Sequence, residues 1–134
     1  MQNSINILLV DDDQDDQFLF GEALHEIQSP VVLHTAMDGV DALEKLSEGG
    51  TKPDLIFLDL NMPRMNGIKF LEMVKATPAF SSIPVIIYST SSSPEDKKAT
   101  QAGGAVAFIT KPTNFDDLCS LLSETVQKDW SVLE

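Results

Sequence analysis

The sequence predicts an α/β fold, a five-stranded parallel sheet with five helices on its two faces. Two observations predict it. Five short apolar runs rich in β-branched residues begin near residues 5, 31, 54, 84 and 105, and stretches with helical spacing separate them. The runs are about one strand-and-helix unit apart, which favours right-handed crossovers between parallel strands.

The apolar runs lack strict polar alternation, which is typical of strands that are buried on both faces of a parallel sheet. The five predicted strands are Ile5 to Val10, Val31 to Ala36, Leu55 to Leu58, Pro84 to Tyr88, and Ala105 to Ile109. Apolar residues repeat with helical period in the segments between and after them. The five predicted helices therefore lie within 18–27, 42–46, 68–75, 94–103 and 115–126.

Residues with known preferences for helix ends support these boundaries. The expected boundary residues are Gly49-Gly50 after the second helix, Asn66-Gly67 before the third, Ser93-Pro94 before the fourth, and Thr113 or Asn114 before the fifth. In such a sheet, ligands bind outside the carboxyl ends of the strands, where the strand order reverses. Polar residues at strand ends are therefore the candidates for function.

The composition predicts one soluble globular domain with a real core. The chain has 134 residues, of which 43% are hydrophobic and 22% charged, which excludes disorder and collagen-like repeats. We expect one domain over 1–134, with a core at about 5–128 and no second, output domain. The single cysteine, Cys119, permits no internal disulfide.

The charge balance excludes some partners. Nine Lys and Arg against 21 Asp and Glu give a net charge of −12, which opposes binding to nucleic acid or to anionic lipid. The apolar runs are much too short for a membrane span or a signal core, so the predicted location is the cytoplasm.

Polar residues follow four of the predicted strands. They are Asp11 and Asp12 after the first, Asp59 after the third, Ser89 and Thr90 after the fourth, and Lys111 after the fifth. Three carboxylates that meet at one sheet edge repel one another, and a hard cation such as Mg²⁺ relieves this repulsion. Lys111 and Ser89 would then contact a phosphate.

These motifs resemble the receiver domain of bacterial two-component response regulators. The matching segments are Val10-Asp11-Asp12, Leu58-Asp59-Leu60-Asn61-Met62-Pro63 with Gly67, Ser89-Thr90, and Lys111-Pro112. The resemblance covers residues 5 to about 128 and implies a flavodoxin-like fold with strand order 2-1-3-4-5. The segments Leu60 to Gly67 and Ser89-Thr90-Ser91 also resemble single-domain regulators found beside phytochrome-type kinases.

The resemblance implies specific roles. Asp59 would be the phosphoacceptor, receiving a phosphoryl group from a histidine kinase, a phosphotransfer protein or a small donor. Asp12 would bind Mg²⁺ directly and Asp11 through water, with Asp59 and the backbone carbonyl of Asn61 completing the site. Mn²⁺ is the alternative cation. Lys111 would help to neutralise the phosphoryl charge.

The resemblance also implies how the signal is passed on. Ser89 matches the hydroxyl that moves to the phosphate, and Phe108 matches the aromatic switch. Thr90 departs from the family pattern, which has a small residue there, so slower phosphorylation or exchanged roles of Ser89 and Thr90 are expected alternatives. The output would be contacts with a downstream protein or a homodimer through the fourth-helix to fifth-helix face. No enzymatic activity beyond slow autophosphatase is expected.

A calcium loop is an alternative for the acidic cluster. Asp11, Asp13, Asp15 and Glu22 stand at EF-hand spacing, but Asp16 occupies the position where that loop needs glycine. We instead assign Asp13, Asp15 and Asp16 to the start of the first helix, where negative charge is favoured.

Two other classes share the predicted architecture. A haloacid-dehalogenase-like phosphatase has a second Asp two residues after its nucleophile, where this chain has Asn61. A flavodoxin-like FMN module needs a phosphate loop after the first strand, where the aspartates of this chain would repel the phosphate. Both remain alternatives to the receiver.

Overall fold

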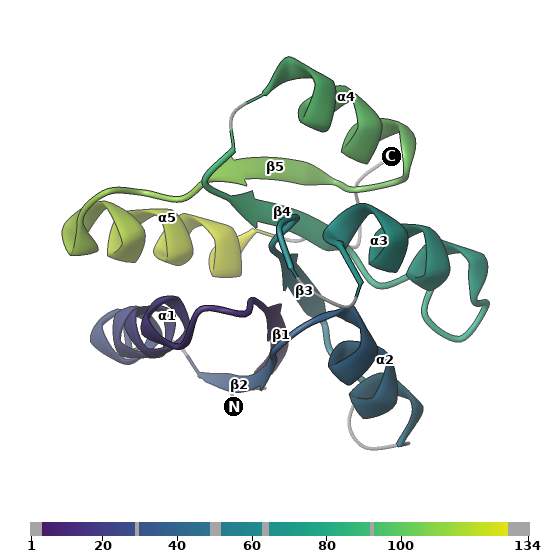
Figure 1. Ribbon diagram of the computed structural model, residues 1–134. Helices are drawn as coiled ribbons and strands as arrows, with labels where there is room; N and C mark the ends of the chain where they lie inside the picture. The colour runs from purple at the N-terminus through teal and green to yellow at the C-terminus, as the bar shows by residue number, and fades with distance from the viewer. Residues whose placement is uncertain (1–3, 29, 49–51, 63–64, 92, 129–134) are drawn as a thin grey trace.

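In the computed structural model, five strands alternate with five helices along the chain (Figure 1). The structure describes residues 4–28, 30–48, 52–62, 65–91 and 93–128. In chain order the elements are β1 Ile5–Val10, α1 Gln14–Glu26, β2 Val31–Ala36, α2 Gly39–Ser47, β3 Leu55–Leu58, α3 Gly67–Ala76, β4 Val85–Ser89, α4 Pro94–Ala102, β5 Ala107–Thr110 and α5 Phe115–Gln127.

The strands form one parallel sheet in the order β2-β1-β3-β4-β5, which confirms the predicted fold and strand order. Helices α1 and α5 cover one face, and α2, α3 and α4 lie on the other (Figure 1). The strand order reverses between β1 and β3. The carboxyl ends of these two strands therefore flank the place where an open α/β sheet binds its ligands.

The bounds of two strands, β4 and β5, differ from the predicted ones at both ends. The fourth strand begins after Pro84, whose carbonyl accepts from Ile56 but which has no amide N–H to donate. The fifth strand begins at Ala107 because Ala105 donates to the carbonyl of Thr100 and so belongs to the turn that ends α4. The fourth strand also ends one residue later than predicted, so Ser89 is the last residue of β4 rather than a loop residue.

The predicted helix starts are confirmed by side-chain caps. Asn66, Ser93 and Asn114 accept hydrogen bonds from backbone N–H groups in the first turns of α3, α4 and α5. Asn114 rather than Thr113 therefore caps the last helix. The predicted Gly49-Gly50 boundary and Pro63 of the third-strand motif lie outside the described residues.

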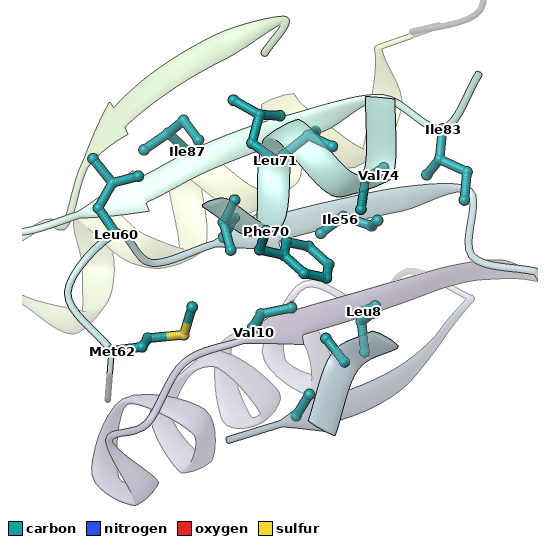
Figure 2. Packing of buried hydrophobic residues seen from close by; sticks show 14 residues of the cluster. Leu8, Val10, Ile56, Leu60, Met62, Phe70, Leu71, Val74, Ile83 and Ile87 are labelled. Atoms are coloured by element: carbon teal, nitrogen blue, oxygen red, sulfur yellow. The ribbon is translucent and has the colours of Figure 1, made fainter. Parts of the chain in front are cut away.

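The sheet separates two hydrophobic clusters. One lies under α2 and α3, where Figure 2 shows Phe70 among side chains of β1 and β3. The other lies under α1 and α5 and contains three aromatic rings in edge-to-face contact, with centroids 5.0 Å apart for Phe20 and Phe57 and 5.6 Å apart for Phe20 and Tyr88.

Only the three central strands are buried on both faces, so the expectation of two-sided burial was wrong for the outer strands. In β2, Val32 and His34 are exposed, and in β5 no residue is fully buried. The reason is position, because β2 and β5 are the edges of the sheet and only part of each is covered by helices. Among the described residues, no helix is long and apolar enough to cross a membrane.

Candidate functional site

Three carboxylates meet where β1 and β3 end. Carboxylate oxygens of Asp11, Asp12 and Asp59 all lie within 4.8 Å of one another. Asp11 is completely buried and Asp59 is 6% exposed, whereas Asp12 is the most accessible of the three. The backbone N–H of Asp59 donates to the carbonyl of Val10 at 2.9 Å, which continues the sheet ladder one residue beyond the strands and fixes the Asp59 backbone beside β1.

The loop after β3 is shaped to hold Asp59. The backbone N–H of Asn61 donates to Asp59 Oδ1 at 3.3 Å, and that of Gly67 donates to the carbonyl of Leu60 at 3.0 Å. A Cβ atom on Gly67 would lie 2.5 Å from the backbone oxygen of Asp59, closer than real side chains come. Glycine at position 67 therefore allows the start of α3 to pack directly against the loop that carries Asp59.

Lys111 brings a positive charge to these carboxylates from the loop after β5. Its Nζ donates to Asp11 Oδ2 at 2.8 Å and lies 3.6 Å from Asp59 Oδ2. Its backbone N–H donates to the carbonyl of Ser89 at 2.8 Å, and its ammonium lies 5.5 Å from the centre of the Tyr88 ring. The Lys111 side chain is only 9% exposed, so its interactions are little screened by water.

Burial opposes the ionised form of two of the carboxylates. Burial raises the pKa of Asp11, although the hydrogen bond from Lys111 partly offsets this effect. Burial also raises the pKa of Asp59, against the attraction of Lys111. Burial alone would lower the pKa of Lys111, but its hydrogen bonds to Asp11 and Asp16 outweigh that effect and raise the pKa. One lysine thus leaves the acidic cluster incompletely neutralised.

Asp16 also binds Lys111, so assigning it only to the helix start was incomplete. Its Oδ2 accepts from Lys111 Nζ at 2.7 Å. Helical spacing carried a signal that could have shown this, because Asp16 is followed at four- and three-residue steps by the buried Phe20 and Ala23. That spacing places Asp16 on the inward face of α1.

The other aspartates of the cluster have the predicted helix-start role. Asp13 caps α1, and its side chain accepts from the backbone N–H groups of Asp15 and Asp16. Asp15 already lies inside the helix, which begins at Gln14. A calcium loop would need residues 11–22 as a loop, so the EF-hand alternative does not fit this structure.

The residues assigned to the switch lie beyond the carboxylates, toward α4. Ser89 is completely buried, and its Oγ accepts from the backbone N–H of Ser91 at 3.2 Å, whereas Thr90 is exposed. Phe108 is half-buried against the cluster under α2 and α3, and Lys97 Nζ lies 5.7 Å from its ring centre. Strand alternation places Ser89 on the same face of the sheet as Phe108.

Comparison with known proteins identifies the class. The model of the response regulator receiver domain matches residues 7–123, and the chain belongs to this family. PilG of Pseudomonas aeruginosa is 30% identical over 92% of this chain and 89% of its own length. The response regulator Rcp1 of Synechocystis is 31% identical over 92% of this chain and 87% of its own length.

Solved structures agree with the fold. The phosphorylated cyanobacterial phytochrome response regulator RcpA superposes with a TM-score of 0.85 at 32% identity, covering 93% of each chain. The Mn²⁺-bound form of Rcp1 superposes with a TM-score of 0.81 at 30% identity, covering 97% of this chain and 96% of that one. The relatives that are methylesterases are much longer, and this chain covers about a third of them. Receiver domains are in general signalling modules rather than enzymes.

Proposed function

We propose that Asp59 accepts a phosphoryl group from a histidine kinase or a phosphotransfer protein, and that the chain signals through phosphorylation-dependent protein contacts. The observation that carries this proposal is the grouping of Asp11, Asp12 and Asp59 with Lys111 at the carboxyl ends of the strands. Phosphoryl transfer depends mainly on positioning and on neutralising charge, and this grouping supplies both.

The donor set fits a divalent cation. Asp11, Asp12 and Asp59, with the backbone carbonyl of Asn61, would hold Mg²⁺, with Mn²⁺ as the alternative. The raised pKa values of Asp11 and Asp59 support this assignment. Burial disfavours the ionised forms of these two carboxyl groups, and a bound cation would offset that cost. The Mn²⁺-bound structure of the similar Rcp1 supports it as well. When bound, the cation supplies positive charge to the phosphoryl oxygens and keeps Asp59 ionised.

The proposed reaction uses Asp59 as the nucleophile. A carboxylate oxygen of Asp59 forms a bond to phosphorus, while the bond from phosphorus to the leaving group breaks and its electron pair leaves with that group, the imidazole of a phosphohistidine donor. Lys111 donates a hydrogen bond to a phosphoryl oxygen. The buried position of Asp59 limits access of water to the acyl phosphate.

The neighbouring residues argue against the two alternatives. A phosphatase that turns over rapidly needs a general acid near the leaving group, and the residue two positions after Asp59 is the neutral Asn61. An FMN module needs phosphate-binding N–H groups after β1, but the N–H groups of Asp15 and Asp16 at the start of α1 are already used by the Asp13 cap.

The proposed readout involves Ser89 and Phe108. The Ser89 hydroxyl moves to the phosphoryl group, and the Phe108 ring follows it and alters the surface formed by α4, β5 and α5. That surface would bind a downstream protein or a second copy of the chain. Because RcpA is a phytochrome response regulator and the sequence segments Leu60 to Gly67 and Ser89 to Ser91 resemble such regulators, the proposed phosphoryl source is a phytochrome-type histidine kinase.

Intact mass spectrometry tests the acceptor. After incubation with acetyl phosphate and Mg²⁺, the wild-type chain should gain the mass of one phosphoryl group, and the Asp59→Asn variant should gain none. The exposed Glu72→Gln on α3 removes the same formal charge and should be labelled like the wild type. Labelling that survives in Asp59→Asn would refute Asp59 as the acceptor, and rapid turnover of phosphate esters would favour the phosphatase.

A further inference from the structure

A carboxylate outside the proposed cation ligands makes the shortest contact to the lysine of the site. Lys111 Nζ lies 2.7 Å from Asp16 Oδ2, against 2.8 Å from Asp11 Oδ2 and 3.6 Å from Asp59 Oδ2. Asp16 comes from the first turn of α1, whereas the other two residues follow β1 and β3. The lysine is therefore shared between the acceptor and a helix that borders the site.

The backbone around Asp16 is tied to the site. The N–H of Asp16 donates to the capping carboxylate of Asp13 at 3.1 Å. In the same turn, Gln17 Nε2 donates to the backbone carbonyl of Asp11 at 2.7 Å, which joins α1 to the end of β1. With the backbone held at both points, Asp16 can release Lys111 only by rotation of one of the two side chains.

The donors of the ammonium group are limited. Asp11 and Asp16 accept hydrogen bonds from two of the three N–H donors of the ammonium, and Asp59 Oδ2 lies beyond hydrogen-bond distance at 3.6 Å, so the ammonium is held toward Asp11 and Asp16 rather than toward the acceptor. We propose that Asp16 is a positioning residue that competes with the phosphoryl group for Lys111. On this proposal, which rests on Asp59 being the phosphoacceptor, the hydrogen bond from Lys111 to Asp16 is exchanged for one to a phosphoryl oxygen when Asp59 is phosphorylated.

The competition predicts that Asp16 restrains phosphorylation. A charge-assisted hydrogen bond to a carboxylate is stronger than one to a neutral amide, so Asp16→Asn weakens the hold on Lys111. The Lys111 ammonium stays in the site in this variant, because Asp11 still accepts from it and the carbonyl of Ser89 still accepts from the Lys111 backbone N–H. Phosphorylation of Asp59 should therefore be faster, and the phosphoryl group should be lost more slowly, each by about fivefold, the factor given by one net hydrogen bond.

A neighbouring carboxyl provides the matched control. Asp15 lies in the same helical turn, is exposed, and makes no contact with Lys111 among the interactions of the described residues. Asp15→Asn removes the same formal charge beside the site. It therefore controls for the weaker repulsion of an anionic phosphoryl donor, which both substitutions cause. Only the difference between the two variants reports the contact of Asp16 with Lys111.

The experiment measures the rate of phosphorylation by acetyl phosphate with Mg²⁺, and then the half-life of the phosphoryl group after the donor is removed. The proposal expects Asp16→Asn to exceed Asp15→Asn in both quantities, and Asp16→Glu to restore part of the wild-type restraint. Equal values for Asp16→Asn and Asp15→Asn, or slower phosphorylation in Asp16→Asn, would overturn it. A wild-type chain that takes up no phosphoryl group contradicts the proposed function instead.

A spectroscopic measurement on the unphosphorylated chain tests the contact separately. Nitrogen-15 NMR selective for lysine ammonium groups should show a signal of Lys111 whose protons exchange slowly with water. Asp16→Asn should speed this exchange, and Asp15→Asn should leave it unchanged. A Lys111 signal that is the same in all three chains would overturn the proposal whatever the outcome of the phosphorylation assay.

Discussion

Two regions that border the site differ in how tightly they are packed, namely α1 with α5 on one face of the sheet and α4 with β5 at its edge. Helices α1 and α5 enclose the aromatic rings of Phe20, Phe57 and Tyr88, and α1 also binds Lys111 through Asp16. On the other side, α4 buries a single residue, Thr100, and an open groove of about 710 Å³ separates it from β5, lined in part by Lys97 and Phe108. The α1 side therefore holds Lys111, and the α4 side borders Ser89 and Phe108.

We therefore expect the two regions to respond differently to phosphorylation. A phosphoryl group on Asp59 changes the charge between α1 and α4, and the region of α4 and β5, which buries few residues, costs less free energy to rearrange. We expect α1, which is packed against the sheet and paired with Lys111, to stay in place while α4 and β5 move.

The largest expected effect is on stability. Phe20 is fully buried against two aromatic rings, so Phe20→Ala should lower the free energy of unfolding by about 3–5 kcal/mol. Thr100 donates only to the carbonyls of Asp96 and Lys97 in its own helix, so Thr100→Ala should cost about 1 kcal/mol or less. Urea unfolding measures both, and equal losses would contradict the contrast between the sides.

The next prediction removes charge from the centre of the site. Because burial raises the pKa of Asp59, the stability that this carboxyl contributes is present below its unfolded pKa and is lost as pH rises through the folded pKa. With EDTA present at pH 7, Asp59→Asn should therefore be more stable than the wild type, and this advantage should disappear below about pH 4.

The same measurement has its control in Glu72→Gln, which removes an exposed charge on α3 and should show no such pH-dependent gain. Addition of Mg²⁺ should stabilise the wild type more than Asp59→Asn, because the variant lacks one of the carboxylates proposed to hold the cation. An Asp59→Asn chain that is less stable than the wild type at pH 7 without cation would contradict the view that burial of the ionised Asp59 carboxylate destabilises the fold.

The smallest effect is expected at the α4 side. Ser89→Ala should weaken the coupling between phosphorylation and binding of a downstream partner, with little change in the phosphorylation rate, because the buried hydroxyl is assigned to the readout. Thr90→Ala should leave the coupling intact and, by removing an exposed branched side chain, speed phosphorylation. The ratio of partner affinities with and without phosphorylation measures the coupling, and loss in Thr90→Ala alone would exchange the two roles.

The sequence predicted the fold and the cap residues well because those depend on local patterns. Apolar runs and capping side chains act within a few residues, and the bounds of β1, β2 and β3 were predicted to the residue. The starts of β4 and β5 were placed too early because Pro84 has no N–H to donate to a neighbouring strand and Ala105 donates to the carbonyl of Thr100 at the end of α4. Strand propensity does not register the partner of Ala105.

The candidate site shows the same limit. Strand-end position was sufficient to group Asp11, Asp12, Asp59 and Lys111, since parallel strands end at one edge. The role of Asp16 was missed because the same residue satisfies both the preference for negative charge at a helix start and the ion pair with Lys111. An acidic residue in the first turn of a helix is accounted for by the helix dipole, so nothing in composition calls for a partner 95 residues away.

Amide hydrogen exchange tests the division between the two sides most directly. The chain is compared before and after phosphorylation with acetyl phosphate and Mg²⁺, with Asp59→Asn as the control. The account predicts changed protection in α4 and β5, preserved protection in α1, and no change in Asp59→Asn. A phosphorylated chain in which α1 changes most, or in which α4 and β5 stay as they were, would contradict it.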